Sequence, residues 1–119
     1  ALGLAWATLA ASRGELGDAR GFSNGLKAAR DAGPNEGWLA QFRAELVIRY
    51  ADIADNHAYA IEEADLQVLA RGVRSIGWIA ATYAYDHAFR KRVLSAVSKM
   101  PANQQGKFIE LLRSSLARE

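Results

Sequence analysis

The chain contains no cysteine, and its other scarce residues are two prolines, two histidines and one methionine. The absence of cysteine excludes disulfide bonds, thiolate metal sites and a cysteine nucleophile, and it is compatible with both the cytosol and the periplasm. Long tracts rich in proline, serine or other polar residues are missing too, which argues against extended disorder. The remaining composition, half apolar and 24% charged, is that of an ordinary globular protein.

Long hydrophobic runs are also missing, since none reaches the roughly 18 residues that a membrane-spanning helix needs. The opening ALGLAWATLAA is short and has no basic segment before it, so it is neither a membrane span nor an intact signal peptide. The chain lacks an initiator methionine, and we expect it to be part of a longer protein. Its 119 residues suffice for one compact domain over 1–119.

Acidic residues are scarce in the second half of the chain. Residues 1–60 hold six Lys/Arg and seven Asp/Glu, whereas residues 66–118 hold nine Lys/Arg against only Asp86 and Glu110. The formal net charge of +2 conceals this asymmetry. A basic half is suited to an acidic surface, whether of a protein, a lipid membrane or a nucleic acid.

The sequence shows no alternation typical of strands, and it is rich in Ala, Leu, Arg and Glu, which favour helices. We therefore predict an all-α fold, with residues 52–59 as a loop. The predicted helices cover about 2–13, 18–31, 36–51, 61–76, 78–85, 86–99 and 101 onward.

Glycines crowd the segment between Arg13 and Glu36: Gly14, Gly17, Gly21, Gly25 and Gly33. Glycine closes helices at low cost, so we expect a turn at 14–17 between two antiparallel helices. Asp18 is suited to cap the second helix, and Asn35 the third. The two glycines inside the second helix, Gly21 and Gly25, indicate either a close approach of a neighbouring helix or a site that tolerates the loss of helix stability.

The spacing from Trp6 onward carries a family resemblance. Its members are Trp6, Leu9, Ala10, Gly17, Phe22, Leu26, Ala29 and Pro34. This pattern resembles a tetratricopeptide repeat (TPR), a helix pair of about 34 residues with an early Trp-x2-Leu-Gly and a late Pro. The departures are Arg13 at the usual Tyr position and Phe22 at a usual small-residue position. Trp38 starts a second, less complete unit, and Trp78 a fainter one.

The resemblance implies antiparallel helix hairpins stacked as a short TPR-like array, with the hairpin at about 2–35 and further helices over 36–119. Since about three such units are usually needed, we expect either that the C-terminal helices cap the stack or that more repeats lie upstream in the full-length protein. The resemblance also implies protein scaffolding, often within larger bacterial assemblies. The alternative reading is a plain irregular helical bundle. For the core, we predict that Trp6, Leu9, Leu26, Trp38 and Phe42 pack together, and that Leu66, Leu69, Val73 and Ile76 form the buried side of the fourth helix.

Residues with catalytic spacing are hard to find. His57 and His87 have no metal-ligand spacing, and no serine lies in a nucleophile-elbow context. The acidic residues Glu62, Glu63 and Asp65 are expected to favour the start of the fourth helix through its dipole. We therefore predict a protein that is not an enzyme and that binds no metal or nucleotide cofactor.

The most suggestive polar feature is the basic set Arg71, Arg74, Arg90, Lys91 and Arg92. We predict that these residues lie on the surface and bind a partner, with a merely solvated face as the alternative. The leading functional hypothesis is a non-catalytic protein–protein interaction module that binds a protein or peptide. The alternative is a basic bundle that binds nucleic acid or an anionic membrane face through residues 71–92. A DNA-reading helix–turn–helix is disfavoured because the second helix is rich in Gly and Ala.

Overall fold

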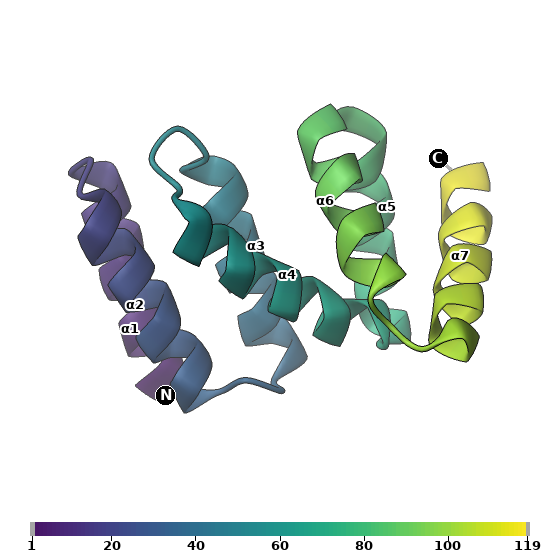
Figure 1. Cartoon of the computed structure of the whole chain (residues 1–119), viewed down its shortest axis with the longest axis horizontal. Coiled ribbons are helices and arrows are strands. Elements are labelled where there is room, and N and C mark those ends of the chain that lie inside the picture. The colour runs from purple at the N-terminus through teal and green to yellow at the C-terminus, as the bar shows by residue number, and fades with distance from the viewer. Residues whose placement is uncertain (1, 119) are drawn as a thin grey trace.

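The computed structural model describes residues 2–118, which fold into helices joined by short connections, as the all-α prediction requires (Figure 1). In chain order the elements are α1 (Leu2–Glu15), α2 (Ala19–Ala32), α3 (Gly37–Arg49), α4 (Asn56–Ala70), the 3-10 turn η1 (Val73–Ser75), α5 (Ile76–Tyr85), α6 (His87–Ser98) and α7 (Ala102–Ala117). Within this part of the chain, no helix combines the length and the apolar character needed to cross a membrane.

The helices pack as antiparallel pairs, α1 with α2, α3 with α4 and α5 with α6. The pairs follow one another along the longest axis of the molecule, and α7 lies at the far end against α5 and α6 (Figure 1). The molecule measures 38 × 26 × 23 Å along its principal axes. The α1–α2 hairpin therefore lies at one end of the row and α7 at the other.

The first hairpin confirms the predicted antiparallel pair and moves its turn slightly. Gly17 has a φ of 72°, the left-handed conformation that favours glycine, and it closes the hairpin. Asp18 caps α2, since its carboxylate accepts a hydrogen bond from the Gly21 N–H at 2.9 Å. Gly14, predicted to lie in the turn, is instead a buried residue of α1. A methyl group there would lie 2.8 Å from the Tyr50 ring, so glycine admits that ring.

The buried face of α1 is made of small residues, Gly3, Ala7, Ala10 and Gly14, and it faces both α2 and α3. A methyl group on Gly25 of α2 would lie 2.9 Å from the Cα atom of Ala10. The two backbones are therefore in direct contact, as the glycines of α2 predicted, and no bulky side chain fits between them.

The predicted core is wrong for three of its five members. Trp6, Leu9 and Trp38 are 38%, 39% and 56% exposed, whereas Leu26 is fully buried and Phe42 packs half-buried against the core. Since the small face of α1 points inward, its Trp and Leu side chains must point outward.

The buried residues form two apolar clusters. The first joins α1–α4 around Phe22, Leu26 and Val47, and the edge of the Phe22 ring meets Tyr50 with ring centroids 5.5 Å apart. The second joins α3–α7 around Phe89 and Phe108. The two clusters lie in sequence along the row of hairpins, and α3 and α4 contribute residues to both.

The middle of the chain departs most from prediction. The expected loop over 52–59 ends early, because Asp55 caps α4 by accepting the Ala58 N–H at 3.0 Å. The Ser23 hydroxyl donates to the same carboxylate at 2.6 Å. This hydrogen bond, together with the one from the Ala58 N–H, lowers the pKa of Asp55. At the other end α4 stops at Ala70, so Val73 is 67% exposed instead of buried.

Two predicted helix boundaries also differ. Asn35 does not cap α3; Glu36 occupies the cap position and its side chain makes no capping hydrogen bond. Gly77, expected to break the chain, lies inside α5. By contrast, Asp86 caps α6 as predicted, since its carboxylate accepts the Phe89 N–H at 3.0 Å.

Candidate functional site

The five basic residues predicted to bind a partner fall into two groups. Arg71 directly follows α4 and Arg74 lies in η1, whereas Arg90, Lys91 and Arg92 lie near the start of α6. Helix α5 separates the groups, and its ten residues span about 15 Å. The structure therefore does not bring the five residues together as one patch.

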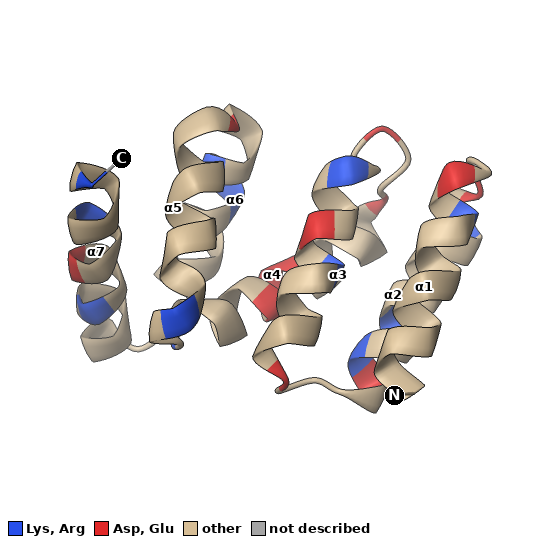
Figure 2. Ribbon diagram, turned by 180° about the vertical axis from the view of Figure 1, so that it is seen from behind, with Lys and Arg blue, Asp and Glu red and all other residues tan. Residues whose placement is uncertain are grey.

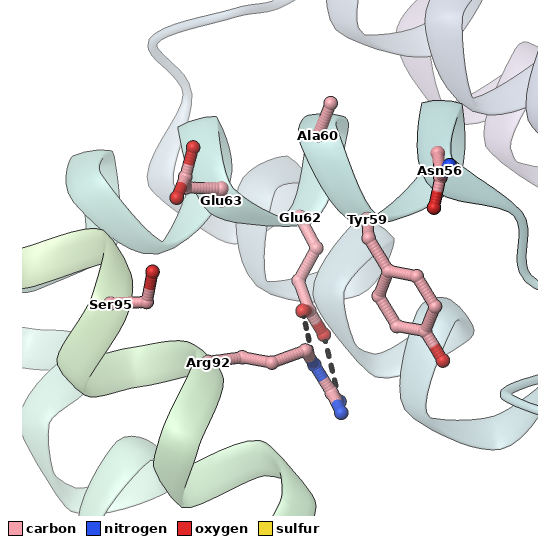
Figure 3. Close-up of a pocket in the computed structure, with 7 residues that line it drawn as sticks. All are labelled: Asn56, Tyr59, Ala60, Glu62, Glu63, Arg92 and Ser95. Carbon is pink, nitrogen blue, oxygen red and sulfur yellow. Dashed lines mark hydrogen bonds and ion pairs between the residues drawn. The ribbon is translucent and has the colours of Figure 1, made fainter.

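Arg92 is committed to a contact within the molecule. Its guanidinium donates two hydrogen bonds to the Glu62 carboxylate, which lies on α4 and is 1% exposed (Figure 3). The guanidinium also lies 5.1 Å from the centroid of the Tyr59 ring. Burial raises the pKa of Glu62, and the hydrogen bonds and charge of Arg92 oppose that rise. The pair thus links the second hairpin to the third.

Arg90 is also used structurally. Its guanidinium donates to the backbone carbonyls of Tyr83 and Ala84, at 3.1 and 3.3 Å, and lies 5.1 Å from the Tyr83 ring centroid. These carbonyls belong to the last turn of α5, whose unpaired C=O groups attract cations. Arg71, Arg74 and Lys91 are exposed, so they are the members of the predicted set that remain accessible.

A second ion pair is fully buried between the two helices of the second hairpin, and its arginine also reaches the first hairpin. Arg43 on α3 is fully buried and donates to both carboxylate oxygens of Asp65 on α4, at 2.9 and 2.8 Å. Its other nitrogen donates to the carbonyls of Ala29 and Gly33, at the end of α2. Burial raises the pKa of Asp65, and the contacts with Arg43 oppose this. Arg30 of α2 adds a weaker contact to the same carboxylate at 3.6 Å.

The sequence analysis assigned Glu62 and Asp65 only to the dipole of the fourth helix, and it did not consider Arg43. The signal that was available is spacing, since Ala58, Glu62, Asp65 and Leu69 recur every three or four residues along one face of α4. A charge in an apolar stripe requires a buried partner of opposite sign.

An accessible surface forms where η1 meets α7. Val73, Leu111 and Lys107, together with Glu110 and Ser114, line a hollow of about 420 Å³. Arg74 directly follows Val73 in the chain, and Arg71 lies two residues before it. We call Arg71, Val73, Arg74, Lys107 and Leu111 the η1–α7 surface. Sequence reasoning identified its two arginines but missed the valine, which it expected to be buried, and both α7 residues.

The cations of the η1–α7 surface are not held in ion pairs. Among residues 2–118, neither arginine nor the lysine of this surface forms an ion pair with a carboxylate. Acidic segments gather on α1–α4, whereas α5–α7 carry mainly basic ones (Figure 2). The hollow itself holds Lys107 and Glu110 beside the exposed Val73 and the half-buried Leu111, and the exposed Arg71 and Arg74 flank Val73 in the chain.

Other reactive side chains are scattered. His57 and His87 are exposed near the first residues of α4 and α6. Over residues 2–118, no three His, Cys, Asp or Glu side chains lie close enough together to hold a metal ion. No family model, no curated protein and no solved structure matches this chain.

Proposed function

We propose that this protein is a non-catalytic scaffold, a short TPR-like array of helix hairpins that binds an acidic segment of a partner protein. The antiparallel pairs that follow one another in a row support the array, and so does the Trp6 spacing of the sequence. The Arg92–Glu62 ion pair connects the second and third hairpins, and the buried Arg43, paired with Asp65 inside the second hairpin, donates hydrogen bonds to the end of α2 in the first. A surface held in place in this way loses little conformational freedom when a partner binds.

The observation that carries the proposal is the η1–α7 surface. Unpaired surface cations contribute little to stability, so folding alone does not account for their accumulation. Val73, which is 67% exposed, and the half-buried Leu111 add apolar area around Lys107. Such a mixture fits an acidic segment that also carries aliphatic side chains, and the positive charge raises the rate at which that segment associates.

The test is a titration with a fluorescein-labelled acidic peptide built from Glu-Glu-Leu repeats, followed by anisotropy. Replacing Arg71, Arg74 and Lys107 together with glutamine is expected to weaken binding at least about tenfold, or 1.4 kcal/mol. The matched control replaces three exposed cations elsewhere, Arg20, Lys27 and Lys91, and therefore has the same net charge. An equal loss of peptide affinity in both triple variants would mean that binding depends on net charge alone, and the proposal would be wrong.

Binding of nucleic acid is the competing function. A fluorescein-labelled DNA duplex titrated under the same conditions decides between the two. The proposal expects the acidic peptide to bind more tightly than the duplex. Tighter duplex binding that weakens steeply with salt, and that the η1–α7 variant abolishes, would favour the nucleic-acid alternative.

A further inference from the structure

Helix α2 carries a polar face that lies beside the start of α4 (Figure 1). Its members are four residues at positions i, i+3, i+4 and i+7 of one helix, so they share one side of α2. With the first two turns of α4 they surround a hollow of about 490 Å³, a volume in the range of small-molecule sites. The lining of this α2–α4 hollow is Arg20, Ser23, Asn24 and Lys27 from α2, and Asp55, His57, Ala60 and Ile61 from the start of α4.

The two cations of the α2–α4 hollow are accessible to a ligand. Arg20 is exposed, and it forms no ion pair with a carboxylate among residues 2–118. Lys27 pairs with Asp31 at 3.0 Å, but both side chains are exposed, at 73% and 67%, and such pairs are worth at most about 1 kcal/mol. Arg20 and Lys27 lie two turns apart on α2, about 10 Å along its axis, so their long side chains can reach one group placed between them.

The carboxylate that lines the hollow is already engaged. Asp55 accepts hydrogen bonds from the Ser23 hydroxyl at 2.6 Å and from the Ala58 N–H at 3.0 Å, both on its Oδ1 atom. With this carboxylate included, the lining side chains carry a formal net charge of +1 when His57 is neutral. Asp55 therefore reduces the positive charge of the hollow without cancelling it.

We propose that the α2–α4 hollow binds a small organic phosphate monoester. Such a group carries a charge of about −1.5 to −2 at pH 7 and three strong acceptor oxygens. Arg20 and Lys27 supply the opposite charge, and the exposed Asn24 amide supplies a further N–H donor. The exposed Ala60 and the half-buried Ile61 offer apolar contact to the organic part of the molecule. A monocarboxylate of the same size has less charge and binds more weakly.

This site is separate from the η1–α7 surface, because its residues all belong to the first two hairpins. Binding of a phosphate monoester is therefore independent of the proposed binding of an acidic segment. The Arg20→Gln/Lys27→Gln variant should bind the Glu-Glu-Leu peptide like wild type. Conversely, the triple η1–α7 variant should bind a phosphate monoester like wild type, so that either proposal can fail without the other.

The first test titrates phenyl phosphate into ¹⁵N-labelled protein at neutral pH and follows the amide chemical shifts. The shifts should saturate with a dissociation constant at or below about 1 mM, and they should cluster at residues 20–27 and 55–61. Benzoate, which has the same ring and a single charge, is the matched ligand and should bind several-fold more weakly. The proposal is overturned if the phenyl phosphate shifts do not saturate, if they lie outside these residues, or if benzoate binds as tightly.

The second test changes the cations of the hollow. Arg20→Gln/Lys27→Gln should weaken the binding of phenyl phosphate at least tenfold. The matched control Arg71→Gln/Arg74→Gln removes the same charge from another surface and should bind like wild type. An equal loss in both double variants would show that phenyl phosphate responds to net charge alone, and the proposal would be wrong.

The third test keeps both cations and alters the hollow itself. Asn24→Trp places a large side chain in the hollow and should abolish the binding of phenyl phosphate. Asp55→Asn removes the negative charge, retains a residue type that caps helices, and should tighten binding at least twofold. Circular dichroism spectra that match wild type show that the variants are folded. Unchanged binding by a folded Asn24→Trp variant, or an Asp55→Asn variant that binds no more tightly than wild type, would overturn the proposal.

Discussion

Truncation of Arg43 offers the sharpest test of how the hairpins are joined. Arg43→Met removes two hydrogen bonds to Asp65 and two to backbone carbonyls, all in a fully buried site. It leaves the Asp65 carboxylate, itself 0% exposed, with only the 3.6 Å contact from Arg30. Breaking a buried pair by removing one partner typically costs about 3–5 kcal/mol. That is a large share of the roughly 5–15 kcal/mol by which domains are stable.

Urea unfolding followed by circular dichroism measures this loss. With a slope near 2 kcal/mol per molar urea, the midpoint should fall by about 2 M. The double variant Arg43→Met/Asp65→Leu removes both charges and should regain most of the stability, because the cost lies in the unpaired carboxylate. Arg49→Met is the matched control, since its pair with Glu15 is about two-thirds exposed on both sides and is worth at most about 1 kcal/mol.

The reasoning would be refuted by an Arg43→Met variant that loses no more than the Arg49 control. A double variant that is less stable than Arg43→Met would equally contradict it, because the stranded carboxylate could not then be the source of the loss. A change in the slope would show that the variant alters the compactness of the folded or unfolded state, and the comparison would then use the midpoints together with the fitted slopes.

Three further predictions follow from packing and capping. Gly25→Ala should lower the free energy of unfolding by about 1–3 kcal/mol, because the added methyl group forces α1 away from α2. Gly106→Ala, on the open face of α7, is the control and should raise that free energy by up to about 1 kcal/mol. A stabilised Gly25→Ala variant would contradict the close contact between the two helices. Trp38→Ala should lower the free energy of unfolding by much less than the roughly 3–5 kcal/mol expected for Phe22→Ala, because Trp38 is exposed and Phe22 is buried. Equal losses of stability in chemical melts would show that Trp38 is part of the core. Asp55→Ala should cost about 1 kcal/mol at neutral pH. Folding lowers the pKa of Asp55, so the stability that its carboxylate contributes is fully present above the pKa of the unfolded chain, near 4. That contribution is lost as the pH falls through the lower pKa of the folded state. An Asp55→Ala variant whose melts lose as much stability in acid as wild type would contradict this.

The helices and caps that depend on local chemistry were predictable from sequence. Asp18 and Asp86 cap the helices they were expected to cap, and Gly17 closes the first hairpin. These features depend on interactions within a few residues, which the sequence displays directly. The early start of α4 was missed because residues 52–59 are predicted to form a loop, although Asp55 caps the helix locally.

The inward face of α1 could not be deduced from hydrophobicity. Both its large stripe and its small stripe recur at helical spacing, and a search for apolar periodicity selects the larger side chains. The inward face is decided by the neighbouring helix, because Gly25 of α2 leaves room for the backbone of α1 on its small side. Likewise, which basic residues remain accessible depends on which arginines form ion pairs within the molecule. Arg92 pairs with Glu62, which lies 30 residues earlier in the chain on another helix. Such pairings become visible only once the hairpins are packed.

The central claim, that a partner binds through the η1–α7 surface, is tested most directly by mapping amide chemical shifts. The acidic Glu-Glu-Leu peptide is titrated into ¹⁵N-labelled protein at low salt. The account predicts that the perturbed amides cluster at residues 71–75 and 107–114 and that α1 and α2 are unaffected. Perturbations that concentrate on α1 and α2, or spread evenly over every exposed lysine and arginine, would contradict it.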